Sequence, residues 1–106
     1  MDHERSRIHL IEKRSYFKRV NDREYESGWW ALSEETAGGL VGGQIFFHEQ
    51  KKKPSFFGGT VLGFRIETEG EHKDRVIFRL ESSQECKGIR TGPEGWTLEK
   101  KIVLGE

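Results

Sequence analysis

The sequence predicts a mainly β protein: a small closed β-barrel with at most short helical segments. From Gly28 onward, short apolar runs alternate with glycine-containing turns at the spacing typical of all-β barrels and sandwiches. Within each run the apolar residues recur with a period of two, as in a strand that buries one face. The 106 residues suit one compact domain, and closure into a barrel would remove exposed strand edges.

The first 26 residues give the least clear pattern, because their apolar residues fit neither the helical nor the strand period. A strand is favoured over a helix for residues 7–12, RIHLIE. We therefore expect an N-terminal segment whose structure the pattern leaves open at residues 1–26, followed by a barrel formed by residues 27–106.

Five strands are expected in the barrel, at residues 28–33, 44–49, 60–67, 75–82 and 95–104. One face of each strand is the more apolar and is expected to face the core. The residues on these faces are Trp30, Leu32, Ile45, Phe47, Leu62, Phe64, Ile66, Val76, Phe78, Leu80, Trp96, Leu98, Lys100 and Ile102. Residues 34–43 are too rich in glycine for a long helix, so one short helical turn and a tight loop are predicted there.

The charge balance limits which partners the protein could attract. Eighteen basic and eighteen acidic residues cancel, so any contact with nucleic acid should be local rather than a bulk electrostatic attraction. The charged start, MDHERSR, and the absence of an apolar run near the ~20 residues needed to span a bilayer predict a cytoplasmic protein without membrane contact.

The sequence offers no recognisable metal, cofactor or catalytic pattern. Cys86 is the single cysteine, and His3, His9, His48 and His72 show no paired spacing, so neither a metal nor a cofactor is expected. The glycine pairs at 38–39, 42–43 and 58–59 match neither common phosphate-binding pattern and are expected to form turns or strand bends. A protein that is not an enzyme is therefore predicted.

The adjacent indoles of Trp29 and Trp30 raise the first functional hypothesis. Neighbouring side chains in a strand leave on opposite faces, so Trp30 is expected in the core with Leu32 while Trp29 faces outward. An exposed Trp29 could stack on a base, an interaction worth about 1–3 kcal/mol. Alternatively, a terminal segment such as residues 16–20 covers it.

The loop at residues 48–59, HEQKKKPSFFGG, raises the second functional hypothesis. Lys51, Lys52 and Lys53 could contact phosphates while Phe56 or Phe57 stacks on a base, a combination common in single-strand binders. Alternatively, the lysines form a solvated turn and a phenylalanine plugs the end of the barrel.

Three segments in order, GWWALSE, LVGGQIFFHE and FFGGTVLGFRIE, resemble the EVE branch of the PUA-like superfamily over residues 28–67. The resemblance implies a barrel that recognises a modified or flipped nucleobase by aromatic stacking and polar groups at the rim. It points to Trp29 or Trp30, to Phe47 and His48, and less directly to Ser55 and Phe57. Gln44 stands where such domains usually have aspartate, and residues 34–39 are short for their helical segment.

These observations lead to one main hypothesis and two alternatives. The main one is a non-catalytic module that binds a modified or single-stranded nucleic acid. The alternatives are a protein-interaction or inhibitor protein, and a metal-dependent nuclease using Asp74, Glu85 and Lys87. The candidate ligand-binding residues are Trp29, Trp30, Phe47, His48, Lys51, Lys52, Lys53, Ser55, Phe56, Phe57 and Arg65.

Overall fold

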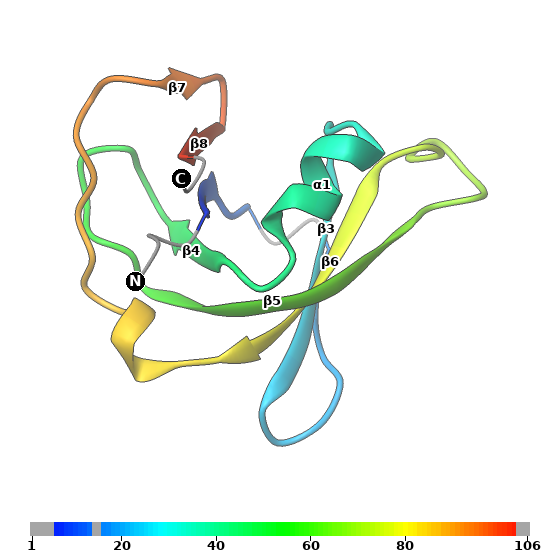
Figure 1. Ribbon diagram of the computed structural model, residues 1–106, viewed down its shortest axis with the longest axis horizontal. Helices are drawn as coiled ribbons and strands as arrows, with labels where there is room; N and C mark the ends of the chain where they lie inside the picture. Colours follow the sequence, from blue (N-terminus) through cyan, green and yellow to red (C-terminus); the bar gives the residue numbers. More distant parts are fainter. Residues whose placement is uncertain (1–5, 14–15, 104–106) are drawn as a thin grey trace.

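The protein forms one curled sheet of eight strands (Figure 1), seen in a computed structural model that describes residues 6–13 and 16–103. The elements are β1 (Arg7–Ile11), β2 (Tyr16–Arg19), β3 (Glu24–Trp30), α1 (Glu34–Leu40), β4 (Gln44–His48), β5 (Phe57–Ile66), β6 (Val76–Ser82), the 3₁₀ helix η1 (Gln84–Cys86), β7 (Trp96–Thr97) and β8 (Lys100–Val103). The prediction of a mainly β protein is confirmed. In the described part of the chain, no helix is long and apolar enough to cross a membrane.

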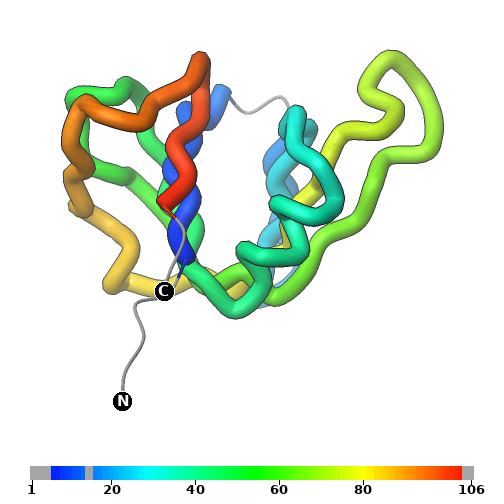
Figure 2. The backbone as a smooth tube through the Cα atoms, turned by 45° about the horizontal axis from the view of Figure 1, so that its top comes forward, coloured from blue at the N-terminus to red at the C-terminus, as the bar shows by residue number. Residues whose placement is uncertain are grey.

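The sheet is open rather than a closed barrel. Its strand order is β2-β3-β6-β5-β4-β1-β8-β7, and among the described residues no ladder joins the edge strands β2 and β7. All neighbours are antiparallel except β1 and β4, which are parallel. Figure 2 shows the two halves of the curled sheet, β4–β1–β8 and β3–β6, facing each other across the interior.

The concave side of the sheet holds the core. The buried apolar residues that pack there are Ile8, Leu10, Trp30, Ala37, Leu40, Ile45, Phe47, Val61, Val76, Phe78 and Leu80. The faces predicted for the strands at 44–49 and 75–82 are thus confirmed. The strand favoured at residues 7–12 is confirmed as β1, and the short helix is α1, whose N-terminus is capped by Ser33 accepting from the Thr36 amide.

Three predictions for core-facing residues, at Leu62, Trp96 and Leu98, are wrong, each because the strand pattern is interrupted; Trp96 lies on the outer face beside His9 and His48. In β5, Val61 pairs with Leu80 but Gly63 pairs with Arg79, so Leu62 is an extra, bulged residue. Val61 therefore faces the core, and Leu62 is 44% exposed. Beyond the bulge the predicted phase returns, and Phe64 packs against the core.

The strand predicted at 95–104 is instead a tight hairpin of β7 and β8, in which Trp96 pairs with Lys101. The chain reverses at Leu98, which has a positive φ of 55° and is 80% exposed. Ile102 still packs partly against the core, because β8 pairs with β1. Residue 104 lies outside the described residues.

The glycines at the start of β5 allow backbones to approach closely. A Cβ on Gly59 would lie 1.9 Å from the Glu81 carbonyl oxygen, and one on Gly58 would lie 2.2 Å from that of Ile45. Gly63, in the same strand, has nothing within 4 Å of its Cβ position. Strands β4, β5 and β6 can therefore pack as they do only with glycine at positions 58 and 59.

We expect Gly59→Ala to lower the free energy of unfolding by about 3 kcal/mol or more, because backbone must move to admit the methyl group. Gly63→Ala is the matched control and should change it by less than about 0.5 kcal/mol. Urea unfolding of both variants measures the difference. Equal effects would show that the approach of β5 to β6 is not a constraint.

Candidate functional site

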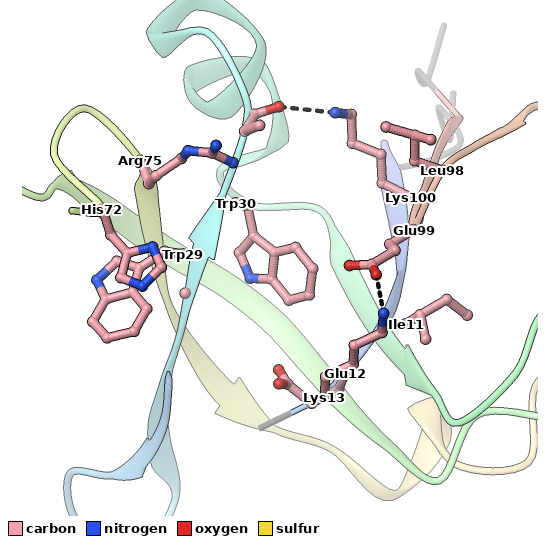
Figure 3. Close-up of a pocket in the computed structure, with 12 residues that line it drawn as sticks. Ile11, Glu12, Lys13, Trp29, Trp30, His72, Arg75, Leu98, Glu99 and Lys100 are labelled. Carbon is pink, nitrogen blue, oxygen red and sulfur yellow. Dashed lines mark hydrogen bonds and ion pairs between the residues drawn. The ribbon is translucent and has the colours of Figure 1, made fainter. Parts of the chain in front are cut away.

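A pocket lies where the curled sheet fails to close, between β3 and the β1–β8 pair. Its volume is about 500 Å³. Residues from the end of β1, the end of β3, the β5–β6 hairpin and the β7–β8 turn line it (Figure 3). It is therefore built from four segments that are far apart in the sequence.

Hydrogen bonds span this opening at the base of the pocket. The Ser27 hydroxyl donates to the Glu12 carboxylate at 2.7 Å and accepts from the Trp30 indole nitrogen at 3.1 Å. Ser27 is fully buried, and Glu12 and Trp30 are each 8% exposed. The indole and the carboxylate are thus fixed relative to each other inside the pocket (Figure 3).

A β-bulge makes the Ser27–Trp30 contact possible. Residues three apart in a regular strand point to opposite faces. Here Ser27 pairs with Phe78 and Trp30 pairs with Val76, so β3 carries one extra residue between them. Both side chains consequently face the concave side, where Phe78 and Val76 are also buried.

The rim of the pocket is charged. Lys100 donates from Nζ to the Ala31 carbonyl at 2.8 Å, and Lys13 forms an ion pair with Glu99. Arg75 lies at the edge (Figure 3), and its side chain forms no hydrogen bond or ion pair with other described residues. The pocket thus combines an aromatic wall, a buried carboxylate and exposed cations.

Trp29 lies on the other side of β3 from Trp30, as predicted, but its ring is covered. The His72 ring stacks on it with centroids 4.0 Å apart and planes at 9°, and the Tyr16 ring lies 5.0 Å away. The Trp29 indole nitrogen is buried and has no hydrogen-bond partner among the described residues. Tyr16 belongs to residues 16–20, so the alternative in which that segment covers Trp29 describes this contact better than an open stacking surface.

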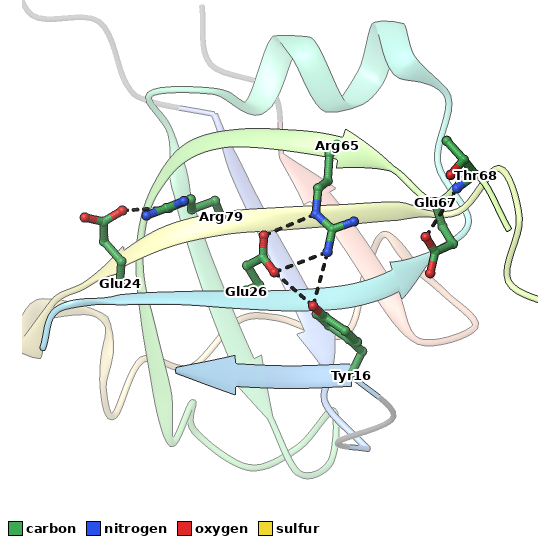
Figure 4. A network of polar contacts seen from close by, with 7 residues as sticks. All are labelled: Tyr16, Glu24, Glu26, Arg65, Glu67, Thr68 and Arg79. Carbon is green, nitrogen blue, oxygen red and sulfur yellow. Dashed lines mark hydrogen bonds and ion pairs between the residues drawn. The ribbon is translucent and has the colours of Figure 1, made fainter. Parts of the chain in front are cut away.

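A polar network holds Tyr16 in place (Figure 4). Arg65 contacts both oxygens of Glu26, at 3.2 and 3.3 Å, and the Tyr16 hydroxyl donates to Glu26 at 2.9 Å. The hydrogen bond from Arg65 lowers the pKa of the Glu26 carboxyl, and burial raises the pKa of Tyr16. Arg65, a predicted ligand-binding residue, is thus engaged in a structural ion pair.

His48, another predicted residue, is buried away from the pocket in a histidine pair. Its Nδ1 lies 2.8 Å from the Lys53 carbonyl oxygen, which can only accept, and its Nε2 lies 2.9 Å from Nδ1 of His9. His48 therefore carries its proton on Nδ1, and His9 donates to Nε2 of His48. The His9 ring stacks on Phe46 at 4.6 Å.

Burial lowers the pKa of both histidines. For His9, burial and the nearby His48, Lys101 and Arg7 lower the pKa from 6.5 to about 4. Both rings are neutral at pH 7 and connect β1, β4 and the loop after β4. His9 was missed because its partner is 39 residues away; its alternation with Ile8 and Leu10 is the one local signal for its orientation.

The remaining predicted residues also lie outside the pocket. Phe47 is in the core, and Phe56 and Phe57 pack partly against it. Ser55 is buried, donates to the Cys86 carbonyl at 2.6 Å and accepts from the Ile89 amide at 3.0 Å. The side chains of Lys51, Lys52 and Lys53 are exposed in the turn.

Of the eleven predicted residues, Trp29 and Trp30 line the pocket and the other nine do not. The pocket-lining residues that sequence reasoning missed include Glu12, Arg75 and Lys100. Nothing in the local sequence around these residues connects them to the tryptophans, because they meet only through sheet curvature.

The residues of the nuclease alternative are not brought together. Asp74 is in the β5–β6 hairpin, whereas Glu85 is in η1 beyond the other end of β6. Within residues 6–13 and 16–103, no three His, Cys, Asp or Glu side chains are grouped so that they could hold a metal ion. His3 lies outside the described residues.

Comparisons of the chain with protein-family models, curated proteins and solved structures found no match. They therefore add nothing to the resemblance of residues 28–67 to EVE domains. Arguments about function rest on the geometry and chemistry of the pocket.

Because His9 is buried in its neutral form, we expect the free energy of unfolding to fall as the pH is lowered. Unfolded His9 takes up a proton near pH 6.5, whereas folded His9 does so only near pH 4. The unfolded state therefore binds more protons between these values, and the free energy of unfolding should drop by about 3 kcal/mol as the pH falls from 6.5 through 4.

Urea unfolding at several pH values measures this slope. Other groups also titrate in this range, so the natural protein is compared with His9→Gln. This variant should be less stable at pH 7, but its free energy of unfolding should change less with pH. The same slope in both proteins would rule out a neutral, buried His9.

Proposed function

We propose that the protein is a non-catalytic binding module that holds a nucleobase in the pocket beside Trp30. The volume of about 500 Å³ falls within the 300–1,000 Å³ typical of small-molecule sites. Its aromatic wall suits a flat ring, and the pocket is open to solvent at the margin of the sheet. These properties support a flipped or unpaired base rather than a base within a duplex.

The observation that supports this proposal most is the buried Glu12 carboxylate beside the Trp30 indole. Proteins read flipped bases by stacking and by hydrogen bonds to the polar edge. A carboxylate only accepts hydrogen bonds and can accept several at once. Glu12 therefore favours a base that presents N–H donors, such as the amino group of cytosine.

The cations at the rim suit the phosphates that flank such a base. The Arg75 side chain forms no hydrogen bond or ion pair with other described residues, and the ammonium group of Lys100 donates to an uncharged group, the Ala31 carbonyl. Because the whole chain has a formal net charge of zero, attraction should be confined to these few groups. The binding should accordingly depend on the base more than on the length of the strand.

The position of α1 agrees with the EVE resemblance, but the residues proposed to contact the base do not. A helix directly after the tryptophan-bearing strand is expected of such domains, and α1 occupies that position. However, the proposed contacts come from Trp30 and from Glu12, which lies outside residues 28–67, and not from Phe47 or His48. We infer a PUA-like arrangement in which the pocket has moved to the open margin of the sheet.

A protein partner is the second candidate, and the observation in its favour is Leu98. This residue lines the pocket and is 80% exposed at the β7–β8 turn. A partner could cover it together with Trp30.

Calorimetric titration with nucleosides and single-stranded oligonucleotides, unmodified and modified, tests the proposal. We expect Glu12→Gln to weaken binding by about tenfold or more, because hydrogen bonds to a charged group are lost. Trp30→Phe should also weaken it, because stacking area is lost. Trp96→Phe is the matched control and should bind like the natural protein, since Trp96 lies beside His9 and His48 and does not line this pocket.

Folding of each variant is checked by circular dichroism. The proposal fails if no oligonucleotide binds at micromolar concentration, or if Trp96→Phe weakens binding more than Trp30→Phe does. Binding of a single stoichiometric protein, with no nucleobase bound, would favour the second candidate.

A further inference from the structure

A second pocket, of about 340 Å³, lies on the opposite face of β1 and β8 from the Trp30 pocket. Leu10 and Lys100 are paired neighbours on the concave side, whereas His9 and Lys101, the next pair in the ladder, face outward. The second pocket is lined by His9 and Lys101 from this outer face, by Phe46 of β4, and by residues from the segment 85–91.

Positive charge dominates the lining of this outer pocket. Among the described residues it contains Arg7, Arg90 and Lys101, with Glu85 as the one acidic residue. Arg90 donates from Nη1 to the Lys52 carbonyl at 3.1 Å, and Lys101 donates from Nζ to the Gly92 carbonyl at 3.0 Å. Both acceptors are uncharged, and no ion pair among the described residues includes Arg90 or Lys101, so their charges remain uncompensated.

The floor of the outer pocket is rigid and can take up a proton. His9 is 3% exposed, stacks on Phe46 and donates to His48, which in turn donates to the Lys53 carbonyl. With Nδ1 engaged in this way, Nε2 of His9 is the nitrogen that would be protonated. Gln44 and Thr91 supply further polar groups in the lining.

We propose that the outer pocket binds a phosphate group, held by Arg90 and Lys101. Arginine pairs with phosphate oxygens through two parallel N–H groups, and lysine supplies a compact charge. A bound anion would lie beside the charges of Arg90 and Lys101, which form no ion pair with described residues. The outer pocket is separate from the nucleobase pocket. The two binding proposals are therefore tested independently of each other.

Titration of the full chain with inorganic phosphate, followed by calorimetry, tests the site. We expect saturable binding that Arg90→Gln and Lys101→Gln each weaken by about tenfold or more. Lys18→Gln removes the same charge from β2, at the other margin of the sheet, and should bind like the natural protein. Circular dichroism confirms that each variant is folded.

The protonation of His9 gives a second readout. Saturating sulfate, which keeps two negative charges in acid, should raise the pKa of His9 by about one pH unit or more from its value near 4. The charged and titratable groups that face His9 or line the pocket with it are His48, Lys101, Arg7, Arg90 and Glu85. Without any anion, Lys101→Gln should itself raise the pKa of His9, because Lys101 lowers it.

Two further ligands distinguish the sources of the phosphate. Stronger binding of a nucleoside 5′-monophosphate than of a dinucleotide phosphodiester would assign the site to a small molecule or a strand end, and the reverse would assign it to a strand interior. Either result supports the site. Absence of saturable binding of all three ligands, or equal weakening by Lys18→Gln, overturns the proposal.

Discussion

The hydrogen bond from Ser27 to Glu12 connects two margins of the sheet that no strand pairing joins. The bond links the end of β1 to β3 across the opening, and the same hydroxyl orients the Trp30 indole. A hydrogen bond to a charged group contributes about 1.5–3 kcal/mol. The contact therefore both holds the sheet curled and sets the spacing of the pocket walls.

The alternation of side chains along the strands then divides the chemistry between two faces. Trp29 and Trp30 are neighbours, yet one ring packs under His72 while the other lines the inner pocket. Lys100 and Lys101 are divided in the same way, between the inner pocket and the cationic outer pocket. One thin layer, β1 with β8, thus separates the proposed base site from the proposed anion site. The chain has no net charge, but its cations are unevenly distributed between local surfaces.

The period-two pattern was sufficient to predict the β class, the core faces of β4 and β6, and the separation of the two indoles. It failed where the chain departs from a regular strand. The bulges at Leu62 and between Ser27 and Trp30, and the reversal at Leu98, leave no mark in hydrophobic alternation. The site was less predictable still, since Glu12, Arg75 and Lys100 reach Trp30 only through long-range strand pairing. The parallel pairing of β1 with β4 likewise brings His9 to His48 without any local signal.

The three indoles report separately on the places where a ligand could bind. Trp30 lines the inner pocket, Trp29 is covered by His72 and Tyr16, and Trp96 lies beside His9 and His48. The most direct measurement is the movement of their indole ¹⁵N–¹H resonances as a nucleoside is added. Binding in the inner pocket predicts a saturating shift of Trp30 with little change at Trp96. A shift of Trp96 alone, or no shift at any indole, would contradict the assignment of the inner pocket as the nucleobase site.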